Sequence, residues 1–91
     1  MPALLKSISS AVYRRDNWHC RSCNSTQGLH PHHVIYQSKG EASKDTLDNL
    51  LTLCWQCHRA VHDGFLIIEV VKVLAADLIV NFWRQKGWRP R

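Results

Sequence analysis

The chain of 91 residues has no long apolar run. Its longest apolar stretch, residues 65–76, is interrupted by Glu69 and Lys72, so no segment approaches the roughly 20 residues of a membrane span. The N-terminus also lacks the uninterrupted apolar core of an export signal, because Lys6 lies within residues 1–8. We therefore expect a cytoplasmic protein with no signal peptide, no transmembrane segment and no membrane partner.

Internal repeats, low-complexity tracts and long linkers are also missing, so residues 1–91 are expected to form a single domain. A chain this short buries only about 60–65% of its unfolded surface, and small domains usually add a disulfide, a metal or a partner. The apolar share of 45% argues against wholesale disorder. Acidic residues are fewer than basic ones, 7 against 12, and the formal net charge is +5. This excess favours a polyanionic partner, although charge alone does not identify one.

Hydrophobic periodicity predicts an α+β fold. Apolar residues at three- and four-residue spacing predict a helix over residues 2–16. β-branched and aromatic residues predict short strands over 29–36 and 50–53, joined by a polar loop over 37–48. A second helix is expected over 55–62, followed by a glycine suited to a left-handed helix cap.

The C-terminal third allows two interpretations. Residues 65–71 have strong β propensity, whereas residues 76–86 fit either a helix or a second strand. The high β-branched content favours a β-hairpin. Trp18, Trp55 and Phe82 are expected in the core, because a small fold needs large apolar groups.

Two Cys-x-x-Cys pairs, Cys20/Cys23 and Cys54/Cys57, are separated by 30 residues. A two-residue gap lets both thiolates of a pair reach one tetrahedral ion, and two pairs complete a four-cysteine zinc site. The alternatives are buried free thiols or a redox dithiol, which normally occurs singly and near a βαβ pattern. We predict one structural Zn²⁺ that ties the end of the first helix to the start of the second.

Four of the six histidines occur in two informative pairs. His58 and His62 are four residues apart on the predicted second helix, so both imidazoles project from one face and can share an ion. His32 and His33 are neighbours on a predicted strand and therefore point to opposite faces. This arrangement suits a division in which one imidazole binds metal and the other transfers protons.

In combination, these motifs resemble the HNH endonuclease family. The resemblance rests on residues 29–35, 48–54 and 57–62, and residues 12–23 are similar to the lead-in of its zinc-stapled members; together they span about residues 11–64. The family has a ββα-metal (His-Me finger) core, in which two antiparallel strands and a helix hold one catalytic divalent ion. The resemblance implies a metal-dependent endonuclease that hydrolyses DNA phosphodiester bonds by nicking or double-strand cleavage.

The resemblance also implies a role for each matching residue. His33 matches the general base, and Asn49 matches the residue that ties down the loop and orients that base. His32, His58 and His62 match the ligands of the catalytic metal, which is Mg²⁺, Mn²⁺, Zn²⁺ or Ni²⁺. His32 stands where many members have Asp, and in this respect the chain resembles the colicin nucleases, which have His there. This softer ligand favours the last three metals.

General chemistry supports the same roles. A neutral imidazole can accept a proton from water at cellular pH, and three histidine ligands leave coordination positions open for a phosphate. His30 is an additional imidazole that competes with His33 for the role of general base.

Basic residues near the motifs predict phosphate contacts at Arg59, Arg21 and Lys39. Arg59 is the strongest of these candidates, because it lies between two predicted metal ligands. Trp88 fits two roles equally, contact with nucleic acid or packing against the hairpin.

The expected partner is DNA. No separate recognition domain is evident, so sequence specificity is either low or supplied by a homodimer mate or a larger phage or restriction partner. Homing, restriction and phage DNA processing are all compatible roles. A catalytically silent, zinc-stabilised nucleic-acid-binding module is the alternative function, and a nucleic-acid-degrading toxin domain is a third.

Overall fold

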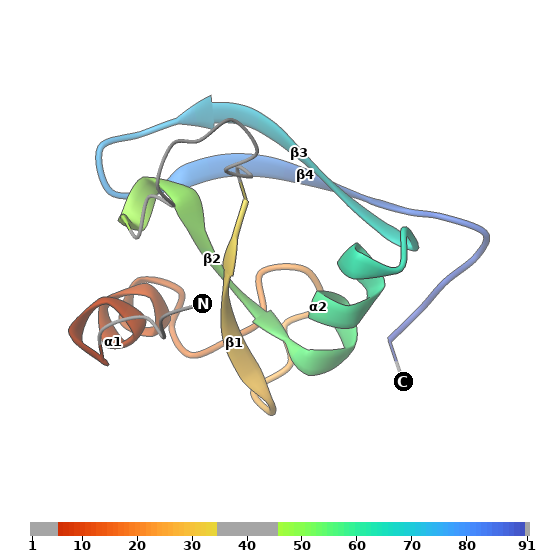
Figure 1. Ribbon diagram of the computed structural model, residues 1–91, viewed down its shortest axis with the longest axis horizontal. Coiled ribbons are helices and arrows are strands. Elements are labelled where there is room, and N and C mark those ends of the chain that lie inside the picture. Colours follow the sequence, from red (N-terminus) through yellow and green to blue (C-terminus); the bar gives the residue numbers. More distant parts are fainter. Residues whose placement is uncertain (1–5, 35–45, 91) are drawn as a thin grey trace.

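The computed structural model describes residues 6–34 and 46–90. In this part of the chain, two helices and two small antiparallel sheets confirm the predicted α+β class (Figure 1). The elements are α1 (Lys6–Arg15), β1 (Leu29–His33), the 3₁₀ turn η1 (Leu47–Asn49), β2 (Leu50–Cys54), α2 (Trp55–His62), β3 (Leu66–Val73) and β4 (Leu78–Arg84).

The first sheet consists of β1 and β2. The strands pair antiparallel, with Leu29 opposite Cys54 and His33 opposite Leu50. All five residues of β2 are buried, because β2 contacts both α1 and α2 and lies between them in Figure 1. Together, β1, β2 and α2 form the expected ββα arrangement.

Helix α2 follows β2 without an intervening loop. Cys54 ends β2 and is also the N-cap of α2, where its sulfur accepts the main-chain N–H of Cys57. At the other end, the N–H of Asp63 donates to the carbonyl of Arg59, and Gly64 turns the chain with φ of 81°. These two ends fix α2 against the sheet.

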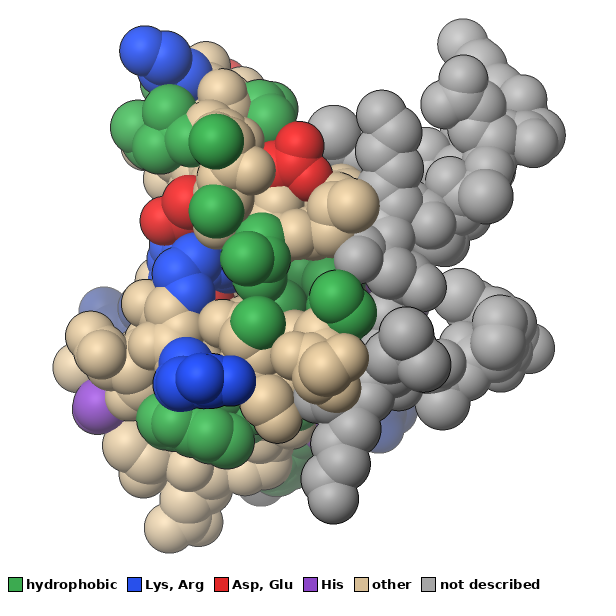
Figure 2. Space-filling model, turned by 90° about the vertical axis from the view of Figure 1, so that its left-hand side faces the viewer, with side chains coloured by type: hydrophobic (Ala, Val, Ile, Leu, Met, Phe, Trp, Pro, Cys, Tyr) green, Lys and Arg blue, Asp and Glu red, His purple; other side chains and the backbone are tan. Residues whose placement is uncertain are grey.

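The C-terminal segment is a β-hairpin, as favoured by its β-branched content. β3 and β4 pair antiparallel with a bulge between Val70 and Lys72, and the hairpin is anchored by the buried Leu66 and Leu78. Much of its remaining apolar surface is exposed. Figure 2 looks onto the side that carries α1 and the β3–β4 turn, where apolar side chains lie among basic and acidic ones.

A buried charge cluster joins α1, the first cysteine pair and the hairpin. The carboxylate of Asp16 accepts hydrogen bonds from Arg15 at 2.8 and 2.9 Å, from Arg21 at 3.0 Å and from the main chain of Thr52 at 3.0 Å. Arg21 also pairs with Asp77 at 2.9 Å. The Asp16 carboxylate thereby connects α1 to β2 directly and to the hairpin through Arg21.

Two details of the sequence-based expectation are corrected. Trp18 and Trp55 are 51% and 53% exposed, so the prediction that they are core residues is wrong, whereas Phe82 packs against the core as expected. The strand predicted over 29–36 ends at His33, and its last two positions lie outside the described residues. Among the described residues, no helix is long and apolar enough to cross a membrane.

Candidate functional site

The four cysteines form one compact cluster. Their sulfur atoms all lie within 4.8 Å of one another, and the sulfurs of Cys23 and Cys54 are 3.5 Å apart. All four are free thiols, and Cys20, Cys54 and Cys57 are buried. This arrangement can hold a zinc ion with four sulfur ligands.

Main-chain groups around the cysteines favour thiolates. The N–H groups of Ser22 and Cys23 point at the sulfur of Cys20 at 3.4 and 3.5 Å, and that of Cys57 points at the sulfur of Cys54 at 3.5 Å. The hydrogen bond from the Cys57 thiol, together with these N–H groups, lowers the pKa of Cys20 to about 4 despite burial. The same bond to Cys20 raises the pKa of Cys57. The four sulfur donors, with main-chain N–H groups that stabilise negative charge on them, fit the predicted structural zinc.

His32, His58 and His62 form a second cluster. Each offers one ring nitrogen, and these nitrogens lie within 4.8 Å of one another. The His58 ring centroid is 5.2 Å from that of His32 and 4.7 Å from that of His62, with the ring planes at 80° and 76°. The rings therefore meet edge to face, with one nitrogen of each turned toward a common point. Three imidazole nitrogens fit a divalent metal ion with open coordination positions.

Burial favours the neutral form of two of these imidazoles. His32 is only 6% exposed, and burial, together with the nearby His58 and His62, lowers its pKa to about 4. Burial also lowers the pKa of His58, as do the neighbouring His62 and His30. The neutral form of imidazole is the one with a lone pair available to a metal.

The two clusters are connected through α2. Cys57 belongs to the sulfur cluster and the next residue, His58, to the histidine cluster. Consecutive residues of a helix lie about 100° apart around its axis, so α2 presents one cluster on each of two neighbouring faces. The position of α2 therefore sets the geometry of both clusters.

His33 and Asn49 lie at the same end of the first sheet. Adjacent strand residues face opposite ways, so His33 projects from β1 on the side away from His32. The main-chain N–H of Val34 donates to the carbonyl of Asn49 at 2.9 Å, and Asn49 is buried. This main-chain bond joins the residue after β1 to the residue before β2.

His30, the additional imidazole considered above as a competing base, lies close to the histidine cluster. Its ring centroid is 5.6 Å from that of His58, and its side chain is exposed. The sequence carried the signal for this, because residues two apart on a strand share a face and His30 precedes His32 by two.

The three predicted phosphate contacts differ in position. Arg59 is 77% exposed on α2 and forms a loose ion pair with Asp63 at 3.5 Å. Arg21 instead directs its guanidinium inward, to Asp16, Asp77 and the carbonyl of Leu78. Lys39 lies outside the described residues.

Comparison with known proteins points to the same part of the chain. The family model of the HNH endonuclease matches residues 20–64, which include both clusters, His33 and Asn49. No curated protein and no solved structure matches the chain.

Proposed function

Because residues 20–64 of this chain belong to the HNH endonuclease family, we propose that the protein is a metal-dependent endonuclease that hydrolyses phosphodiester bonds in DNA. The family membership supports a nuclease-type or nucleic-acid-binding function. The observation that carries the choice of a nuclease is the convergence of His32, His58 and His62. A module stabilised only by four-cysteine zinc has no need of a second, histidine-lined metal site.

The proposed roles are those that the family resemblance implies for the matching residues. His33, the residue after His32 in β1, accepts a proton from the attacking water. Asn49 restrains the segment that carries His33, through its main-chain bond with Val34. His32, His58 and His62 hold the catalytic ion, which when bound supplies Lewis-acid stabilisation of the phosphate and the leaving oxygen.

The phosphate contact is best placed at Arg59. The Arg59 side chain is exposed, and Arg59 is the residue after His58 in α2. Arg21 is less suitable, because binding phosphate would cost it the ion pairs with Asp16 and Asp77. The cofactors are then one structural Zn²⁺ and one catalytic Mg²⁺, Mn²⁺, Zn²⁺ or Ni²⁺, with the histidine set favouring the softer metals.

The test is cleavage of supercoiled plasmid across a series of divalent metals. The wild-type protein is expected to convert plasmid to nicked or linear forms, and which form appears first separates nicking from double-strand cleavage. His33→Ala is expected to lower the rate at least about a hundredfold, since general-base catalysis contributes that much or more.

His19→Ala is the matched control, because His19 lies outside the histidine cluster and bonds to the carbonyl of Asn17. It is expected to cleave at the wild-type rate. Equal cleavage by His33→Ala and His19→Ala would contradict the assignment of the base. Binding of plasmid without cleavage in any metal would instead establish the catalytically silent module.

A further inference from the structure

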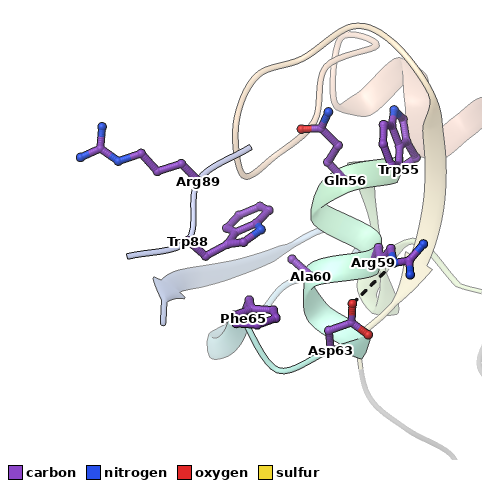
Figure 3. A pocket seen from close by; sticks show the side chains of 8 residues that line it. All are labelled: Trp55, Gln56, Arg59, Ala60, Asp63, Phe65, Trp88 and Arg89. Atoms are coloured by element: carbon purple, nitrogen blue, oxygen red, sulfur yellow. Dashed lines mark ion pairs between the residues drawn. The ribbon is translucent and has the colours of Figure 1, made fainter. Parts of the chain in front are cut away.

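A hollow lies between α2 and the C-terminal segment, on a part of α2 that the metal clusters do not use. Its volume is about 350 Å³, within the usual range for ligand pockets. Trp88 and Phe65 line one side, the small Ala60 lies on α2 opposite them, and Trp55 lies at one end (Figure 3).

A second hollow of about 580 Å³ lies next to the first. Both are lined by Trp55 and Gln56, and the C-terminal segment reaches both, through Arg89 in the first and Pro90 in the second. The second hollow is lined mainly by hydroxyl and amide side chains from residues 24–27. The two hollows therefore adjoin at Trp55 and Gln56, and together they are called the groove, with an aromatic half and a polar half.

Trp55 is exposed but firmly placed. Its ring covers Gly28, where φ is +61° and a Cβ atom would clash with the indole. A half-exposed indole held against the backbone offers a flat apolar face to solvent without further loss of side-chain entropy on binding. Trp88 is partly buried against the core and lends a second ring to the same groove.

The charges along the groove match a phosphodiester chain. Arg59 and Arg89 are both exposed and line the aromatic half. Asp63 is the acidic residue of this lining, and it pairs with Arg59. Exposed aromatic faces flanked by guanidinium groups are the combination that binds unpaired nucleotides, whose bases stack and whose phosphates are neutralised. A duplex keeps its bases stacked on one another and cannot use the aromatic rings.

We propose that this groove binds an unpaired stretch of DNA, with bases stacked on Trp55 and Trp88 and phosphates beside Arg59 and Arg89. The inference rests on the proposed function and deepens it. Arg59 lines the groove and is the residue after His58 in α2, so the groove and the histidine cluster share this helix. The substrate class is then DNA with a single-stranded segment, such as a flap, a bulge or an open junction.

The test is equilibrium binding by the full, zinc-loaded chain, measured by fluorescence anisotropy without added catalytic metal so that no cleavage occurs. The probes are a labelled single-stranded oligonucleotide and a blunt duplex of the same sequence. Single strands are expected to bind at least several-fold more tightly. Trp55→Ala is expected to weaken single-strand binding about tenfold, as loss of one stacking contact does.

Trp83→Ala is the matched control, because Trp83 is also 53% exposed but lies on the hairpin outside the groove. Arg89→Gln is expected to lower the affinity for both probes. Arg84→Gln is its matched control, because Arg84 lies on the hairpin outside the groove. Equal affinity for the two probes, or equal losses in Trp55→Ala and Trp83→Ala, would overturn the proposal. Since the assay needs no turnover, either result leaves the plasmid test of His33 standing.

Discussion

The side chain of Asp16 is only 2% exposed, so its carboxylate is buried. A buried charge is costly unless other groups compensate it. Arg15, Arg21 and the main chain of Thr52 compensate it with hydrogen bonds. Removing one partner of such a buried pair is more costly than the pair's own net contribution, because an uncompensated charge is left behind.

We expect Asp16→Asn to lower the free energy of unfolding by about 3 kcal/mol. The measurement is urea denaturation of the zinc-loaded protein. Asp63→Asn provides the comparison, since Asp63 forms an exposed pair with Arg59. That pair is worth less than about 1 kcal/mol. Similar losses in the two variants would show that the Asp16 cluster is not a stabilising contact.

The pH dependence of this effect has a definite sign. Burial raises the pKa of Asp16, but hydrogen bonds from Arg15 and Thr52 outweigh it and hold the pKa below its ordinary value of 3.8. The carboxylate therefore contributes stability that is present above the unfolded pKa and lost as pH falls through the folded one. The stability difference between wild type and Asp16→Asn should stay constant from about pH 7 to about pH 5. A difference that narrows already in that range would contradict a lowered pKa.

At the scale of elements, the hairpin is attached to the ββα unit through a few buried residues. Leu78 at the start of β4 is fully buried, whereas its neighbour Ile79 is 47% exposed. Leu66, at the start of β3, is also buried and belongs to the core cluster around the cysteines.

We expect Leu78→Ala to cost about 2–5 kcal/mol of unfolding free energy, and Ile79→Ala well under about 1 kcal/mol. Thermal melts followed by circular dichroism compare the two directly. If Leu78→Ala left the melting temperature at the wild-type value, the hairpin would be an appendage rather than part of the folded unit.

The sequence predicts those elements and clusters that depend on the spacing of residues close together in the chain. The two-residue gap between cysteines, the four-residue spacing of His58 and His62, and the alternation of His32 and His33 are all local. The predictions for Trp18 and Trp55 failed because exposure depends on which elements cover a side chain. Likewise, Arg21 forms a hydrogen bond with Asp77, 56 residues away, and no local sequence pattern predicts that contact.

At the scale of the whole molecule, stability is expected to depend on the sulfur-bound ion. The core cluster contains Cys20, Cys54 and Cys57, so the ion would lie inside the main apolar contact of the fold. Without the metal, the folded core would contain four thiols and would lose the free energy of the metal–sulfur bonds.

We expect a strong chelator, or Cys57→Ser, to unfold the protein, with loss of the circular dichroism signal and of one zinc per chain by elemental analysis. His62→Ala should keep the fold and this zinc while losing metal-stimulated cleavage. A chelator-treated protein with an unchanged melting curve would refute the structural role of the zinc. Unfolding of His62→Ala would assign the histidine cluster to stability instead.

Cys57 and His58 are consecutive residues, so the same turn of α2 carries ligands for both clusters. An ion in either cluster orders that turn for the other, and such a linkage is reciprocal. On the proposed assignment, loss of the sulfur-bound ion would also lower the affinity of the histidine cluster for its metal ion. If the proposed function holds, a newly made or zinc-depleted chain would neither fold nor cleave DNA.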